Sequence, residues 1–311
     1  MAMNVGILGH SPGNGHPFSY SAIINGYSDA GLREAGWPVI HDYVRRRHFC
    51  EFGVEGLRVT CAWTQDAVVT QALCRAANIA TAVASPEEML GQVDAVIIAR
   101  DDAASHRPLA EPFLEAGIPV LIDKPLTLDT DELDYFAPFL RAGKLMSCSG
   151  MRYATELDAC KSAIADYGRL QVLRGTIVND WARYGIHMLD AIFPLLNARP
   201  VSIRALASRH ESLAITMDDG TLVCIDALGE VPPIFRVDIH GSRRHSRHDI
   251  TDNFSMFRRL LSEFAAMAES GRPSESAETT LVVLNTLIAG NQALRNDNEV
   301  VIDGAQLQAV V

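Results

Sequence analysis

The sequence lacks long apolar runs, an excess of positive charge and any spacing typical of metal ligands. No apolar run approaches the ~18–20 residues that a membrane helix needs. Lysine and arginine total 27 against 38 acidic residues, a formal net charge of -11. Proteins that bind nucleic acid or anionic membranes display a basic face, so neither is expected as a main partner. The six cysteines are scattered without a Cys-x-x-Cys motif, which predicts reduced core residues and no metal site.

One basic cluster departs from this balance. It combines Arg243, Arg244, His245, Arg247 and His248. The segments on either side alternate like strands, so a solvated hairpin tip is favoured over an anion site. The chain also enters a strand-like pattern at its first residues, without a basic segment and a long apolar segment ahead of it, so we expect a cytoplasmic protein.

Length and periodicity predict two domains. A chain of 311 residues exceeds the usual single core. Strand-like and helix-like segments alternate over residues 1–125, which indicates a Rossmann-type, doubly wound parallel sheet. Residues 126–311 change to hairpin-like strands and long helices, which favours an α+β domain. The overall prediction is therefore an α/β protein with a domain boundary near residue 125.

The individual elements follow from the same patterns. In the first domain we expect strands at 3–9, 57–63, 80–83, 93–99 and 119–124, with a long insertion at 18–56 that forms a turn or lid. Beyond it we expect a helix at 130–142, a strand at 144–149, a helix at 156–166, a hairpin at Asp218-Asp219-Gly220, and helices at 254–270 and 278–293.

A glycine-rich loop follows the first expected strand and precedes a helix beginning near residue 19. Its glycines are Gly9, Gly13 and Gly15. Backbone amides in such a loop, together with a helix N-terminus, can hold phosphate. A regular G-x-G-x-x-G would need glycine at Ser11 and Asn14, so a turn without a ligand remains an alternative. Near the end of the second strand, where a carboxylate normally takes ribose hydroxyls, the chain offers Thr64 and a displaced Asp66, which leaves the choice of cofactor open.

Two further motifs carry ionisable groups. Asp123-Lys124-Pro125 ends a buried apolar strand, and ligands of α/β sheets bind beyond the carboxyl ends of strands. A surface lysine is the alternative for this motif. His187 and Asp190 lie one turn apart at an expected helix start, where an imidazole and a carboxylate can move protons near neutral pH. A core or capping histidine is the alternative there.

Together these motifs, with Arg152-Tyr153 between them, resemble the glucose-fructose oxidoreductase/inositol dehydrogenase (Gfo/Idh/MocA) family along nearly the whole chain. The family's Glu-Lys-Pro signature corresponds to residues 123–125 and its Gly-x-His-x-x-Asp signature to residues 185–190. The resemblance implies an N-terminal Rossmann domain and a C-terminal domain with an open, mostly antiparallel sheet. It also implies NAD or NADP in the cleft between them and a sugar- or polyol-like substrate.

The site residues are expected on the same resemblance. Lys124 would touch substrate and cofactor, His187 would act as acid/base, and Asp190 would assist as the third catalytic residue. The expected cofactor-binding residues are Gly9, His10, Ser11, Gly13, Asn14, Gly15, Thr64, Asp66, Arg100, Asp101, His106, Asp123, Lys124 and Pro125. The expected substrate-binding residues are Lys124, Arg152, Trp181, Arg183 and His187.

The sequence also departs from the family pattern. Arg100-Asp101 replaces the usual Thr-Pro pair beside the cofactor, and an arginine there could contact a phosphate. Arg183 stands where some members carry an aspartate that relays protons to the histidine, so Asp180 or Asp190 would have to substitute.

The leading hypothesis is hydride transfer between nicotinamide and a substrate carbon, with His187 exchanging the proton and Lys124 polarising the oxygen. A non-catalytic dinucleotide- or sugar-binding sensor is the alternative, whereas a transcriptional regulator lacks a basic recognition helix. We also expect a broad apolar face on the second domain's open sheet, covered in a homodimer or homotetramer.

Overall fold

The computed structural model describes residues 2–273 and 277–302 and divides the chain into two compact units. The first combines the described residues of 1–127, 134–147 and 253–277, and the second those of 128–133, 148–252 and 278–311. The chain thus leaves the first unit close to the expected boundary at residue 125, but two later segments return to it. Within the described residues, no helix has the length and apolar character needed to cross a membrane.

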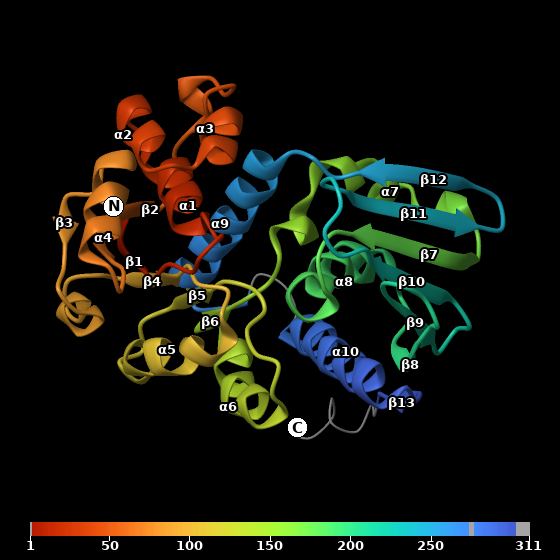
Figure 1. Ribbon diagram of the computed structural model, residues 1–311. Coiled ribbons are helices and arrows are strands. Elements are labelled where there is room, and N and C mark those ends of the chain that lie inside the picture. The colour runs from red at the N-terminus through yellow and green to blue at the C-terminus, as the bar shows by residue number, and fades with distance from the viewer. Residues whose placement is uncertain (1, 274–276, 303–311) are drawn as a thin grey trace. The chain divides into compact units, whose positions relative to one another are not determined.

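The first unit is built on a six-stranded parallel sheet in the order β3-β2-β1-β4-β5-β6 (Figure 1). Its strands are β1 Met3–Leu8, β2 Leu57–Trp63, β3 Thr81–Ala82, β4 Ala95–Ile98, β5 Val120–Ile122 and β6 Leu145–Met146. Every residue of β4 and β5 is buried, as expected for central parallel strands covered on both faces. The predicted Rossmann-type sheet is confirmed, although β5 ends at Ile122 rather than at Lys124.

Helices surround this sheet in the usual βα alternation. They are α1 His16–Asn25, α2 Asp29–Glu34, α3 Pro38–Val44, α4 Ala67–Ala76, α5 His106–Glu115, α6 Thr130–Arg141 and α9 Asn253–Ser270. The expected insertion at 18–56 contains α2, α3 and most of α1. Helix α9, which we expected in the second domain, packs on this unit instead, because Phe257 contacts the rings of His16 and Tyr20 at 5.1 and 5.3 Å.

The second unit carries a seven-stranded mixed sheet in the order β12-β11-β7-β10-β9-β8-β13. Its strands are β7 Leu170–Ile177, β8 Pro200–Ala205, β9 Glu211–Met217, β10 Leu222–Ala227, β11 Phe235–Gly241, β12 His245–Asp249 and β13 Val300–Val301. Among the described residues of this sheet, β7 and β10 pair in parallel and the other neighbouring strands pair antiparallel. The predicted hairpin at Asp218-Asp219-Gly220 joins β9 to β10, and Arg243 and Arg244 lie at the tip between β11 and β12.

The helices of this unit are α7 Asp158–Ser162, α8 Ile186–Ile192 and α10 Ala277–Asn296. The continuous helix expected at 156–166 is wrong, since α7 has five residues with a 3-10 turn on each side. The Glu156 carboxylate accepts the backbone N–H groups of Thr251 and Asp252 at 2.7 and 2.9 Å, which ties the start of this segment to the chain after β12. A tertiary contact therefore overrides the local helical pattern.

The two faces of the second sheet differ in character. Helix α8 covers one face, where Gly175 of β7 lies so close to Met188 that a Cβ would stand 2.9 Å from it. The opposite face carries ion pairs across neighbouring strands: Arg236 with Asp249 at 2.6 Å, and Arg247 with Asp238 at 2.8 Å. On β11 and β12 the expected apolar face is therefore not found, because the outward residues of these two strands are charged and paired.

Candidate active site

The glycine-rich loop after β1 forms a tight turn before α1. The N–H of Asn14 donates to the carbonyl of Ser11 at 3.0 Å, with Pro12 and Gly13 at the two central positions. Gly13 has φ +81°, and a Cβ there would meet nothing within 4 Å. Proline followed by a left-handed glycine is the signature of a type II turn. The turn therefore leaves open space beside its backbone, close to where α1 begins.

Ser11, which stands at an expected glycine position, joins this loop to the segment after β4. Its hydroxyl donates to Asp102 at 3.0 Å and accepts the N–H of Asp101 at 3.2 Å. Asp102 also accepts two hydrogen bonds from Arg100, both at 2.7 Å. Burial raises the pKa of Asp102, but the bonds from Arg100 and Ser11 outweigh it and lower that pKa to about 2. Arg100 and Asp102 therefore form a charged pair beside the loop.

The side chain of Arg100 also lies directly against the backbone of Gly9, at the start of the loop. A Cβ on Gly9 would stand 2.4 Å from the Cγ of Arg100, and Gly9 has φ +82°. Both conditions require glycine at this position.

Asp123 links the strand β5 to the loop. Its carboxylate lies 2.6 Å from His16 Nδ1, accepts the Asn14 amide at 2.8 Å and accepts the N–H of Lys124 at 2.9 Å. Tyr20 adds a longer bond at 3.5 Å. Burial raises the pKa of Asp123, but the charges of His16 and Lys124 more than offset it, so the net shift is downward. An ionised, buried carboxylate thus fixes the backbone of Lys124 against the glycine turn.

Lys124 and His106 are both enclosed in the first unit. Lys124 is 5% exposed and joins Pro125 by a cis peptide bond. His106 is fully buried, with Nδ1 2.8 Å from the carbonyl of Leu126 and Nε2 2.9 Å from that of Arg100. His106 therefore holds together the segments that follow β4 and β5.

At the end of β2 the predicted ribose-binding residues have local partners. Thr64 is buried and contacts the Thr70 hydroxyl at 2.8 Å, and Asp66 accepts the N–H of Val68 at 2.8 Å as the N-cap of α4. The N–H of His10 donates to Gln65 at 3.2 Å. Burial lowers the pKa of His10, and the positive charge of Arg100 lowers it further. Thr64, Asp66 and His10 remain predictions as cofactor ligands.

The glycine turn, the start of α1 and Arg100 together fit the diphosphate of a dinucleotide. The open face of Gly13, the N-terminus of a ten-residue helix and the guanidinium of Arg100 supply space, amide groups and positive charge. The irregular loop motif therefore retains the physical features of a phosphate-binding turn.

In the second unit, His187 is held by a buried polar network. Its Nδ1 lies 2.5 Å from the hydroxyl of Ser149, and the Ser149 N–H donates to Asp190 at 2.6 Å. Asp190 also accepts Arg152 Nε at 2.9 Å, and Arg152 donates to the Thr280 hydroxyl at 3.1 Å. The helix start at residue 186 thus brings His187 and Asp190 together through Ser149, a residue that the sequence analysis missed.

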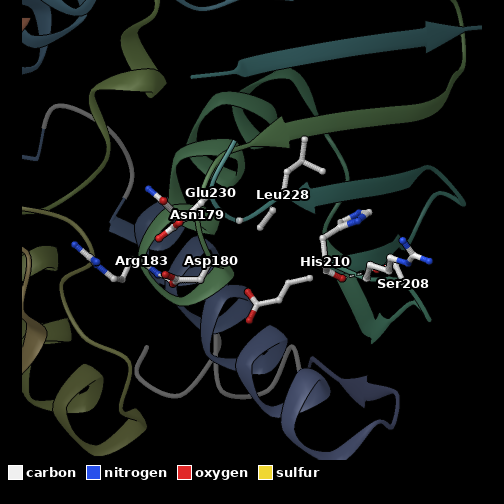
Figure 2. Close-up of a pocket in the computed structure, with 11 residues that line it drawn as sticks. Asn179, Asp180, Arg183, Ser208, His210, Leu228 and Glu230 are labelled. Atoms are coloured by element: carbon white, nitrogen blue, oxygen red, sulfur yellow. Dashed lines mark hydrogen bonds between the residues drawn. The ribbon is translucent and has the colours of Figure 1, made fainter. Parts of the chain in front are cut away.

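The predicted substrate-binding residues of this unit occupy different environments. Trp181 is fully buried, where its Nε1 donates to the carbonyl of Leu287 at 2.9 Å, so it serves the core. Arg152 is 3% exposed and belongs to the network above. Arg183 instead lines a cavity of about 510 Å³, shown in Figure 2. Its other charged or titratable lining residues are Asp180, Arg209, His210, Glu211 and Glu230.

The 3-2-1-4-5-6 parallel sheet, with a glycine turn before α1 and a lysine after β5, defines the first unit as a Rossmann fold of the dinucleotide-binding class. Residues 36–144 match the family model Gfo/Idh/MocA, described as an oxidoreductase family with an NAD-binding Rossmann fold. This part of the chain is therefore similar to that family.

Individual proteins are also similar to this chain. A UDP-N-acetylglucosamine 3-dehydrogenase of Acidithiobacillus ferrooxidans is 27% identical over 202 residues, which cover 58% of this chain and 64% of that protein. The match thus spans less than two thirds of this relative's length. Among solved structures, myo-inositol 2-dehydrogenase from Lactobacillus plantarum has a TM-score of 0.76 at 15% identity and covers 97% of this chain and 100% of that one. Myo-inositol dehydrogenase from Lactobacillus casei, in complex with NAD(H) and myo-inositol, has a TM-score of 0.75 at 15% identity, covering 97% of each chain. These structures share the fold of both units.

Proposed function

We propose that this protein is an NAD(P)-dependent oxidoreductase that transfers a hydride between nicotinamide and a carbinol or carbonyl carbon of a sugar, polyol or related molecule. The observation that carries the proposal is Asp123-Lys124 directly after β5, tied by Asn14 and His16 to a turn that fits a diphosphate. The match of residues 36–144 to an NAD-binding oxidoreductase family supports the same reaction class. A non-catalytic sensor is not favoured, because the relatives and structural neighbours are named as dehydrogenases.

When bound, the nicotinamide cofactor would supply or accept the hydride. The residues of the chain handle the substrate oxygen, and the family resemblance assigns Lys124 and His187 to it. In that assignment His187 exchanges the proton with the oxygen, while Lys124 stabilises the negative charge that develops there. Asp190 contributes by holding Ser149 beside His187.

The substrate class is inferred from the relatives. One relative is named for a nucleotide sugar, and two structural neighbours are named for inositol. UDP-N-acetylglucosamine and myo-inositol are therefore the first substrates to test.

The decisive experiment is a titration of the purified full chain with NADH and NADPH, followed by nicotinamide fluorescence. We expect saturable binding of at least one cofactor, and turnover when a suitable sugar or polyol is added with the oxidised form. Binding without turnover across a broad substrate panel would favour the sensor function. Binding of neither cofactor would contradict the proposal.

A further inference from the structure

The inference concerns His16, the first residue of α1, which follows the glycine turn directly. Its Nδ1 lies 2.6 Å from the carboxylate of Asp123, and its backbone N–H donates to the side chain of Asn14 at 2.9 Å. The imidazole stacks on the ring of Tyr20 at 5.0 Å and packs edge to face with the ring of Phe257 at 5.1 Å. These contacts all lie within the first unit, and they fix the imidazole at the start of the helix.

The carboxylate of Asp123 decides which ring nitrogen of His16 is free for a ligand. An ionised carboxylate only accepts hydrogen bonds, so Nδ1 carries a hydrogen and donates it to Asp123. Nε2 has no hydrogen-bond partner within residues 2–273 and 277–302, and this atom is not buried. The side chain of His16 keeps 19% of its surface exposed. Nε2 is therefore the nitrogen that can meet a ligand held at the glycine turn.

A diphosphate at this turn would approach the buried negative charge of Asp123. The turn and the carboxylate are directly joined, because the Asn14 amide donates to Asp123 at 2.8 Å. Two anions repel each other strongly in a partly buried site unless a cation compensates them. Protonation of His16 supplies this cation, since Nδ1–H stays on Asp123 and Nε2–H becomes available to a phosphate oxygen.

We propose that His16 is a diphosphate-binding residue that takes up one proton from solvent at Nε2 when a dinucleotide binds, and donates this hydrogen to a phosphate oxygen. The inference rests on the proposed function, because the diphosphate is that of the proposed cofactor. Since the bound form holds one more proton, the affinity for the dinucleotide falls as the pH rises. The total loss should be roughly ten- to hundredfold, the size of a hydrogen bond to a charged group.

The surroundings of His16 offer no other group for this proton exchange. Among the described residues, the ionisable groups in contact with His16 are Asp123 and the phenol of Tyr20, 3.5 Å from Nδ1. The charge of Lys124 acts on Asp123 from the next residue in the chain. Helix α9 contributes the uncharged ring of Phe257. Both Asp123 and Tyr20 lie on the Nδ1 side, so the uptake belongs to Nε2.

The test is isothermal titration calorimetry of the full chain with ADP-ribose at several pH values between about 6 and 10, a range that includes the titration of imidazoles. ADP-ribose carries the diphosphate without the nicotinamide, and its diphosphate keeps the same charge over this range. Titrations in two buffers with different ionisation enthalpies give the number of protons taken up. In the wild type we expect a maximum uptake of about half a proton or more, as a tenfold linkage requires. Binding without uptake at every pH would overturn the inference, and this measurement needs no variant.

Three variants assign the proton. His16→Gln should bind with the weaker, pH-independent affinity, because its amide can donate to Asp123 but takes up no proton. His41→Gln is the matched control and should keep the wild-type uptake, because His41 of α3 also pairs with an aspartate of the first unit, Asp29 of α2 at 2.7 Å. Uptake that is lost in His10→Gln but kept in His16→Gln would place the proton on the other histidine of the loop and overturn the inference.

The same titrations separate this inference from the proposed function. Proton-linked binding of ADP-ribose, in a chain without turnover on any substrate, would support the role of His16 and contradict the oxidoreductase. Turnover together with binding that takes up no proton would do the reverse. Failure of ADP-ribose to bind would contradict both.

Discussion

Lys124 keeps only 5% of its surface exposed, an unusual environment for an ammonium group. Its backbone N–H is fixed by Asp123, whose carboxylate is also bound to Asn14 and His16. The strand-end lysine could be predicted from the sequence, because an apolar strand stops at an acid, a lysine and a proline. His16 and Tyr20 could not, since only folding brings helix α1 to the end of β5.

Replacing Lys124 or His187 by alanine should lower turnover by roughly 10²- to 10⁴-fold, the usual loss when one proton-handling group is removed. Steady-state kinetics with the substrate identified in the screen measures this loss. Lys144→Ala is the control, because Lys144 lies in the same unit but its ammonium donates to the Gly117 carbonyl at an exposed site. Normal turnover in either active-site variant would exclude the role given to that residue.

The downward pKa shift of Asp123 predicts a specific acid sensitivity. A group whose pKa is lower in the folded chain than its ordinary value of 3.8 stabilises the fold above that value, and the contribution is lost as the pH falls below it. Asp123→Asn should therefore reduce the free energy of unfolding by roughly 2–3 kcal/mol at pH 7, the size of lost bonds to a charged group.

Urea unfolding of wild type and Asp123→Asn between pH 7 and pH 3 measures this effect. The difference between the two proteins should begin to shrink below about pH 4, because the unfolded wild type takes up a proton at Asp123 there while the folded carboxylate stays ionised. A difference that stays constant over this range would show that the ionised carboxylate is not the cause.

At the scale of elements, the loop between β1 and α1 shows how a departure from a motif can be compensated. Ser11 and Asn14 replace two expected glycines, and each makes bonds that tie the loop to a neighbouring strand end, through Asp102 and Asp123. The sequence reveals the missing glycines, but only the contacts show why a serine and an asparagine suit these positions.

Gly9 and Gly13 should respond differently to alanine. Both have positive φ, so each substitution should cost about 1–2 kcal/mol in backbone strain. Gly9→Ala should cost more, because its Cβ also meets the stem of Arg100, whereas Gly13 faces open space. Thermal unfolding of both single variants and of Gly9→Ala with Arg100→Ala measures this. Failure of the second substitution to recover part of the Gly9→Ala loss would show that Arg100 is not the obstacle.

The molecule consists of two compact units, and each unit combines three separate stretches of the chain, so no single boundary in the sequence divides them. Helix α9 comes more than a hundred residues after Lys124, yet its buried face, which includes Phe254, Phe257 and Phe264, belongs to the first unit. Phe257 reaches the same His16 that binds Asp123. The first unit therefore needs a distant segment to complete its core.

This division predicts the behaviour of fragments. Residues 1–147 alone should not give a cooperative unfolding transition, because the face that α9 covers would be open to water. The same fragment joined by a flexible linker to residues 253–277 should regain one, and circular dichroism during heating compares the two. Equal cooperativity in both would mean that α9 is dispensable for the first unit.

The sequence by itself determined the Rossmann-type sheet, the glycine turn, the lysine after β5 and the histidine at the start of α8, because each depends on local periodicity or on a short motif. Only the tertiary structure decided which groups hold these residues: His16 and Asn14 on Asp123, Arg100 across Gly9, and Ser149 on His187. It also showed that charged pairs occupy the outer face of β11 and β12. These contacts join positions far apart in the chain, and no local pattern encodes a partner that only folding brings into reach.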